Sequence, residues 1–224
     1  MTVEEKQQCD YTDSRLYKLE TILMKLSSTR KLEDLKVVLK DPSSTGPDPA
    51  YWVFSDVTEG HPELDSGSKN WANITVWAPG KLGEEYNKTF GHYHPENAVD
   101  ETYHVIEGKG ILQLQKRHIE NGVWIKEKVD EVFLIKAEAG DEIIITWEYG
   151  HCWSNVGDEP LITYDNWRSG HSPSDYEPIE KLHGLAYYLL EENGEVKATP
   201  NPNYRNLPKP EWLTPEEYTL KLNL

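Results

Sequence analysis

The 224 residues include 23 lysines and arginines against 39 aspartates and glutamates, and the net charge of −16 argues against nucleic acids and anionic membranes as partners, since both attract electropositive surfaces. No apolar run approaches the ~20 residues of a membrane span, and the start MTVEEKQQCD lacks the pattern of a secretory signal. Two cysteines cannot form a disulfide framework, so we expect a globular protein of the reducing cytoplasm.

Residues 1–49 are predicted to form an N-terminal arm and a linker. Part of the segment 13–40 is predicted to be helical, because four leucines recur every three to four residues: Leu16, Leu19, Leu23 and Leu26. The segment 41–49, DPSSTGPDP, contains three prolines and interrupts regular structure. We interpret it as a surface linker.

Residues 50–200 read as a succession of short strands with almost no helix. Runs of alternating character between glycine and proline clusters predict strands at 50–57, 73–78, 87–94, 101–107, 110–116, 123–136, 141–147 and 160–167. Asn193-Gly194, between residues 187–192 and 195–199, predicts a hairpin with a type I′ turn. Many short strands of this kind are typical of an all-β sandwich or small barrel.

The C-terminal extension, residues 201–224, is predicted to end in a short helix. Thr214 is a suitable cap, Pro215 suits the first helical position, and Glu217 can complete a capping box. We expect this helix to pack on the barrel or on a second subunit.

Residues 91–110, GHYHPENAVDETYHVIEGKG, contain most of the candidate metal-ligating residues. His92 and His94 flank one residue, so both imidazoles point to the same face of a strand. Glu101 opens another strand after a loop, and His151 is expected to follow a third. Three imidazoles and one carboxylate suit a divalent transition metal, with open positions for substrate or water.

Taken alone, the pair of histidines is a weak signal, because 8 histidines in 224 residues give about 0.3 such pairs by chance. Two solvated strand histidines would explain it equally well. The wider spacing is more specific: six residues separate His94 from Glu101, and ten separate Gly140 from His151. These spacings resemble the two signature motifs of the cupin superfamily. Thr146 and Glu148 stand where those motifs usually have proline and glycine.

The six-residue gap before Glu101, where general cupins have about three or four, resembles the cupin-type glucose-6-phosphate isomerases. The resemblance extends from Tyr51 to Tyr204, roughly two thirds of the chain. It is carried by TVWAPGKLG from Thr75, TFGHYH from Thr89, ETY from Glu101, HCWSNVGDEPL and LLEENGEV. It implies a jelly-roll-like cupin β-barrel with a short N-terminal helical arm and a C-terminal helix, and a homodimer.

The resemblance also implies residue roles. The implied metal ligands are His92, His94, Glu101 and His151, and the implied phosphate contacts are Tyr51, Thr75, Thr89 and the backbone of Gly91. The implied sugar contacts are Tyr103, His171 and Tyr176, although four residues separate the last two where the family has about one. Phe90 replaces the family's usual lysine, and Lys88, on the same strand face by parity, is a candidate for its charge.

From this resemblance we expect a metal-dependent aldose–ketose isomerase of glycolysis and gluconeogenesis that interconverts glucose 6-phosphate and fructose 6-phosphate. Glu101, Tyr103 and His171 would be catalytic, through an enediol or a hydride shift. One transition metal per subunit is expected, iron first, with Mn, Ni, Co and Zn compatible with the same ligands. Two alternatives stay open: an Fe(II) dioxygenase and a non-catalytic sugar-binding cupin. Without the resemblance, the phosphate-site tyrosines and threonines would read as core aromatics and strand formers.

Overall fold

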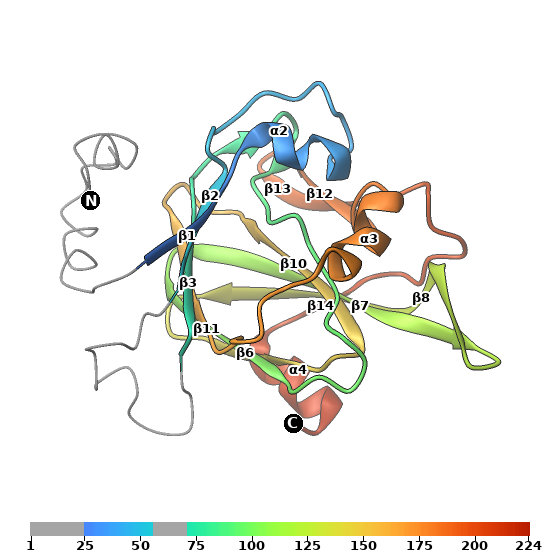
Figure 1. Ribbon diagram of the computed structural model, residues 1–224. Helices are drawn as coiled ribbons and strands as arrows, with labels where there is room; N and C mark the ends of the chain where they lie inside the picture. Colours follow the sequence, from blue (N-terminus) through green and yellow to red (C-terminus); the bar gives the residue numbers. More distant parts are fainter. Residues whose placement is uncertain (1–24, 56–70) are drawn as a thin grey trace.

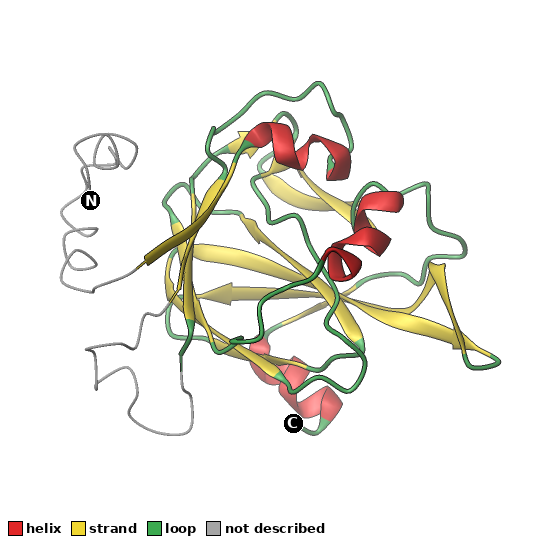
Figure 2. Cartoon of the chain, viewed as in Figure 1, coloured by secondary structure: helices red, strands yellow, loops and turns green. Residues whose placement is uncertain are grey.

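The computed structural model of the chain describes residues 25–55 and 71–224. Strands dominate it, and short helices lie around them (Figure 2). The helices are α2 (Leu32–Leu35), which a 3-10 turn at Lys36–Val38 continues, α3 (Pro173–Lys181) and α4 (Pro215–Leu222). In this described part, none of the helices has the length and apolar character needed to cross a membrane.

Three sheets organise the strands (Figure 1). The first has six antiparallel strands in the order β1 (Lys25–Arg30), β2 (Tyr51–Ser55), β3 (Asn73–Trp77), β11 (Leu161–Asp165), β6 (Glu101–Glu107) and β9 (Glu142–Ile145). The second has the order β10 (Tyr149–Asn155), β7 (Lys109–Glu120), β8 (Val123–Glu138) and β14 (Glu211–Leu213). The third has the order β13 (Glu195–Pro200), β12 (Tyr187–Glu192), β5 (Glu85–Tyr86) and β4 (Lys81–Leu82).

One apolar core joins the first two sheets. Trp77 of β3 packs on Trp153 of β10, with ring centroids 6.4 Å apart, and Tyr103 of β6 packs on the same tryptophan at 5.7 Å. Strand β6 shows why this core forms, because its side chains alternate: Glu101, Tyr103 and Val105 are buried while the residues between them are less so. The result is the all-β barrel that the sequence predicts.

Several predicted elements are confirmed. Strand β6 has the predicted bounds, and β12 and β13 pair as a hairpin in which Asn193 and Gly194 both adopt positive φ, as a type I′ turn requires. Helix α4 begins at Pro215, and the backbone N–H of Glu217 donates to the Thr214 hydroxyl at 3.3 Å. The linker 41–49 contains no helix or strand.

The N-terminal prediction is partly wrong. Leu26, assigned to a helix by its spacing, lies in strand β1 and is 49% exposed; β1 pairs with β2 as an edge strand of the first sheet. Leu16, Leu19 and Leu23 lie outside the described residues. Helical structure in the described part of 13–40 is limited to α2 and the turn after it.

The predicted strand 87–94 is also wrong. Instead of a continuous strand, Lys88 and His92 each make an isolated bridge, to Ser154 and to His151. Gly91 between them has φ +83°, which breaks the pleat, and a Cβ at this glycine would lie 2.4 Å from a methyl carbon of Leu185. His151 lies within β10 rather than after a strand.

Candidate functional site

A cavity of about 410 Å³ opens against the inner face of the first sheet. Strands β2, β3, β6 and β11 contribute to its wall, together with the irregular segment 89–92 and the chain that leads into α3. Nearly all residues predicted for the site line this cavity: Tyr51, Thr75, Thr89, Gly91, His92, Glu101, Tyr103, His151, His171 and Tyr176. His94, the remaining one, lies directly beside it.

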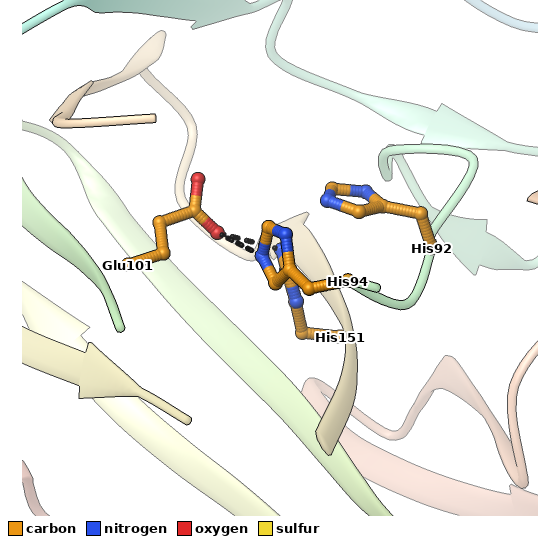
Figure 3. Close-up of side chains that lie close together, drawn as sticks. All are labelled: His92, His94, Glu101 and His151. Atoms are coloured by element: carbon orange, nitrogen blue, oxygen red, sulfur yellow. Dashed lines mark hydrogen bonds and ion pairs between the residues drawn. The ribbon is translucent and has the colours of Figure 1, made fainter. Parts of the chain in front are cut away.

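The four predicted metal ligands converge (Figure 3). His92 and His94 come from the irregular segment before β6, Glu101 is the first residue of β6, and His151 lies in β10. One potential ligand atom from each residue lies within 4.8 Å of the others. Glu101 Oε2 is 2.9 Å from His94 Nε2 and 3.2 Å from His151 Nε2.

These side chains meet the requirements of a metal centre. His92 Nε2, His94 Nδ1 and His151 Nδ1 are buried and have no hydrogen-bond partner among the described residues. Buried polar atoms are normally paired, so a set of unpartnered imidazole nitrogens around a carboxylate fits a divalent cation. Three nitrogens and one oxygen are also a ligand set that such cations accept.

The electrostatics of the cluster favour ligation as well. Burial lowers the pKa of His92 well below its usual value and lowers that of His151, which keeps both imidazoles neutral with free lone pairs. Burial would raise the pKa of Glu101, but hydrogen bonds from His151 and His94 outweigh it and hold that pKa below the usual range. Neutral imidazoles and an ionised carboxylate are the forms that bind metal.

The three predicted sugar-contacting residues surround the cluster. The His171 ring lies 3.9 Å from that of His92, and the Tyr176 ring lies 5.7 Å from His171. Burial lowers the pKa of His171 to about 4 and raises that of Tyr176 to about 12. Burial also raises the pKa of Tyr103 well above its usual value, with a further contribution from the Glu101 charge. All three side chains are therefore neutral at pH 7.

Helix α3 explains how His171 and Tyr176 meet despite the long spacing between them. Asp175 accepts from the Ser172 N–H at 2.8 Å, and Pro173 is the first helical residue, so the chain turns into a helix directly after His171. One turn later the helix returns Tyr176 to the same cavity. The Ser-Pro-Ser-Asp start has the same form as Thr-Pro-Glu-Glu at 214–217, and it was the available but unused signal for this helix.

The predicted phosphate-contacting groups form another part of the cavity wall, here called the predicted phosphate end. The Tyr51 hydroxyl accepts from the Phe90 N–H at 3.4 Å, and the Thr89 hydroxyl accepts from the Trp153 N–H at 3.1 Å. Thr75 lies on β3 and lines the same wall. This end is built from hydroxyl groups held by backbone contacts rather than from ionisable side chains.

Lys88 does not lie at this end, and the interpretation of it as a substitute for the family's lysine is wrong. Its side chain is almost fully buried, and Nζ donates to Glu85 Oε1 at 2.7 Å and to the Val38 carbonyl at 2.8 Å. It does not line the cavity. Because residues 87–94 form isolated bridges and no continuous strand, parity with Phe90 does not decide its direction.

Asp165 and Trp167 were missed from the sequence, yet both line the cavity. Asp165 Oδ1 accepts from Asn73 Nδ2 at 2.6 Å and from the Trp167 N–H at 3.0 Å, and burial raises its pKa well above the usual value, as does the Glu101 charge. The Trp167 ring lies 3.9 Å from that of His94. Strand β11 is buried on both faces, so its sequence does not reveal which face meets the cavity.

Comparisons with known proteins agree with the motifs. The family model described as glucose-6-phosphate isomerase (GPI) matches residues 29–205. A glucose-6-phosphate isomerase from Thermococcus onnurineus is 32% identical over 182 residues, covering 79% of this chain and 86% of that protein. One from Pyrococcus horikoshii is 31% identical over 184 residues, covering 79% and 87%.

Similarity to solved structures is more distant. A Lactobacillus farciminis oxalate decarboxylase is 20% identical and matches 54% of this chain and 29% of its own, with a TM-score of 0.33. An oxalate oxidase structure is 15% identical, matches 52% and 49%, and has a TM-score of 0.36. Overlaps of this size say nothing about the reaction.

Proposed function

The chain belongs to the glucose-6-phosphate isomerase family, and we propose that it interconverts glucose 6-phosphate and fructose 6-phosphate with a divalent transition metal held by His92, His94, Glu101 and His151. The observation that carries this proposal is the convergence of these four side chains at one cavity whose wall also presents the hydroxyl groups of Tyr51, Thr75 and Thr89. Such a cavity can hold a small polar substrate through both sets of groups.

The reaction moves one hydrogen between C1 and C2 of the sugar and one proton between O1 and O2. When bound, the metal supplies positive charge beside the substrate oxygens. Glu101 is buried and ionised, so it is our candidate base for the carbon-bound proton. The Tyr103 hydroxyl and the neutral His171 imidazole are candidates to hold O1 and O2, because both face the cavity beside Glu101.

The phosphate end performs a different task in this proposal. Tyr51, Thr75 and Thr89 offer hydroxyl groups, and the backbone N–H of Gly91 is a further donor, so together they can bind phosphate oxygens. Gly91 lets the chain pass close to β10 and to Leu185, because any side chain there would collide with Leu185. The Tyr176 hydroxyl would contact the sugar.

We propose iron as the metal, with Mn, Ni, Co and Zn able to use the same ligands. We also propose a cytoplasmic homodimer, as the family resemblance implies. Light scattering coupled to gel filtration measures the mass in solution, and a monomer of the purified chain would contradict the dimer.

The test of the reaction is a coupled assay that follows formation of fructose 6-phosphate by metal-loaded protein, with oxygen consumption recorded in parallel. We expect product without oxygen uptake. Oxygen uptake without isomerisation would favour a dioxygenase, and sugar-phosphate binding without either reaction would favour a non-catalytic cupin.

A further inference from the structure

We propose that Arg30 binds the phosphate group of the substrate and so makes the enzyme select phosphorylated sugars. This inference rests on the proposed function, whose phosphate end is formed by Tyr51, Thr75 and Thr89. A sugar phosphate is a dianion, and this chain carries a net charge of −16, so hydroxyl groups alone would bind it against an unfavourable overall field.

Few cationic side chains lie where they could bind the phosphate. Among the described residues that line the cavity, Arg168 is the arginine and there is no lysine. The Arg168 guanidinium donates to the Trp71 carbonyl at 3.0 Å, which holds it on that segment. Lys88 is neutralised by Glu85 beneath the wall. A cationic residue just behind the lining is therefore the candidate to supply positive charge near Tyr51, Thr75 and Thr89.

Arg30 occupies that position. It is the last residue of β1 and lies opposite Tyr51 of β2 in the register. Its guanidinium carbon is 5.7 Å from the centre of the Phe90 ring, which lines the cavity, and the Phe90 N–H donates to the Tyr51 hydroxyl. Its charge acts on the hydroxyls of both Tyr51 and Tyr176, which line the same cavity.

The arginine also has unused binding capacity. Its Nε is buried and has no hydrogen-bond partner within the described residues. Among the described residues, Asp34 is the carboxylate whose charge raises the pKa of Arg30, and its effect is smaller than those of burial, Tyr51 and Tyr176. A half-buried guanidinium that is always charged and has N–H groups to donate matches a phosphate, which offers several acceptor oxygens. The ligand class is thus a sugar with a terminal phosphate monoester.

The experiment compares Arg30→Gln, Arg30→Lys and the control Lys31→Gln, which removes the same charge from the exposed neighbouring residue. Binding of 6-phosphogluconate and of gluconate to metal-loaded protein is measured by calorimetry, and KM and kcat for glucose 6-phosphate are measured in parallel. We expect Arg30→Gln to weaken 6-phosphogluconate about 10- to 100-fold, to leave gluconate unchanged and to raise KM far more than it lowers kcat. Arg30→Lys should recover part of the loss, and Lys31→Gln should match the wild type.

Equal weakening of 6-phosphogluconate and gluconate in Arg30→Gln would assign the residue a structural role and overturn the proposal. So would an equal loss in Lys31→Gln, which would indicate charge acting at long range. Absence of isomerisation in the wild-type protein would instead refute the proposed function, and the difference between the two ligands would still test Arg30. If Arg30→Gln does not fold, Arg30→Lys decides. Wild-type affinities of Arg30→Lys for 6-phosphogluconate and for gluconate would show that the N–H groups of the guanidinium are not what binds the phosphate, and would overturn the proposal.

Discussion

The two ends of the cavity are built on opposite principles. At the proposed metal end, ionisable side chains converge and several of their nitrogens have no partner among the described residues. At the proposed phosphate end, the hydroxyls of Tyr51 and Thr89 already accept hydrogen bonds from backbone N–H groups. The first end offers unpartnered ligand atoms for the reaction, and the second offers hydroxyl groups already fixed in place for binding. We therefore expect changes at the first end to lower kcat and changes at the second to raise KM.

Removing the metal should have the largest effect. Treatment with a chelator should reduce turnover to background, and addition of Fe, Mn or Ni should restore it, because the metal would supply the positive charge beside the substrate oxygens. His151→Ala should lose both metal and activity. His104→Ala is the matched control, since His104 lies on β6 with Glu101 but pairs with Glu142 at 3.5 Å, away from the cluster. Metal content and rate are measured together, and full activity of metal-free protein would contradict the proposed site.

Glu101→Gln should have the next largest effect. It preserves the shape of the side chain and removes the base, so kcat should fall about 10²- to 10⁴-fold. A carboxylate bound to a cation is a weak base, because the cation stabilises its charged form, so Glu101 must be partly released by substrate oxygens. Isomerisation in D₂O, with deuterium at C1 and C2 measured by NMR, tests whether solvent enters. Near-normal turnover in a metal-loaded Glu101→Gln protein would point to a hydride shift.

At the phosphate end, Tyr51→Phe and Thr75→Val should each raise KM for glucose 6-phosphate about 10-fold or more, with kcat changed much less. Thr163→Val is the matched control, because Thr163 lies directly opposite Thr75 in the sheet and does not line the cavity. Steady-state kinetics with glucose and with its phosphate measure the effect. Equal turnover of the two sugars by the wild-type protein would show that no phosphate site operates.

The smallest effect on catalysis is expected for Lys88→Met. Both partners of the Lys88–Glu85 pair are almost fully buried, so removing the lysine leaves an uncompensated carboxylate and should lower the free energy of unfolding by about 3–5 kcal/mol. KM should not change, since Lys88 does not reach the cavity. Chemical denaturation and kinetics provide the two readings. The double variant Lys88→Met, Glu85→Gln should recover part of the stability, and a large rise in KM would return Lys88 to the phosphate site.

The elements that the sequence predicts correctly are those whose residues carry a local signal, such as alternating burial or a helix cap. Strand β6 was predicted to its bounds because one of its faces is buried more deeply than the other, and helix α4 because its cap and proline are read locally. The segment 87–94 was wrong because a single residue, Gly91, changes the backbone direction, and period-two reasoning does not register a positive φ.

The site residues divide in the same way. The histidines and Glu101 were found because their spacing is a motif. The positions of Asp165, Trp167 and Arg30 depend on which strands become neighbours. The pairing of β1 with β2 and of β11 with β6 joins distant segments and cannot be inferred from the residues of one segment alone. Lys88 was misplaced because its partner Glu85 lies in the short strand β5, which was not predicted, and because residues 87–94 form no continuous strand.

The C-terminal extension has a consequence for solubility. Strand β14 pairs in parallel with β8 and forms the last strand of the second sheet. Tyr218 of α4 packs on Phe133 of β8 with ring centroids 5.8 Å apart. Without these residues, Phe133 to Ile135 would present unpaired backbone groups along a hydrophobic margin, where the strand of another molecule could add. The last residues thus cover the edge of the second sheet and prevent intermolecular strand pairing. Truncation would remove this protection even with every cavity residue left in place.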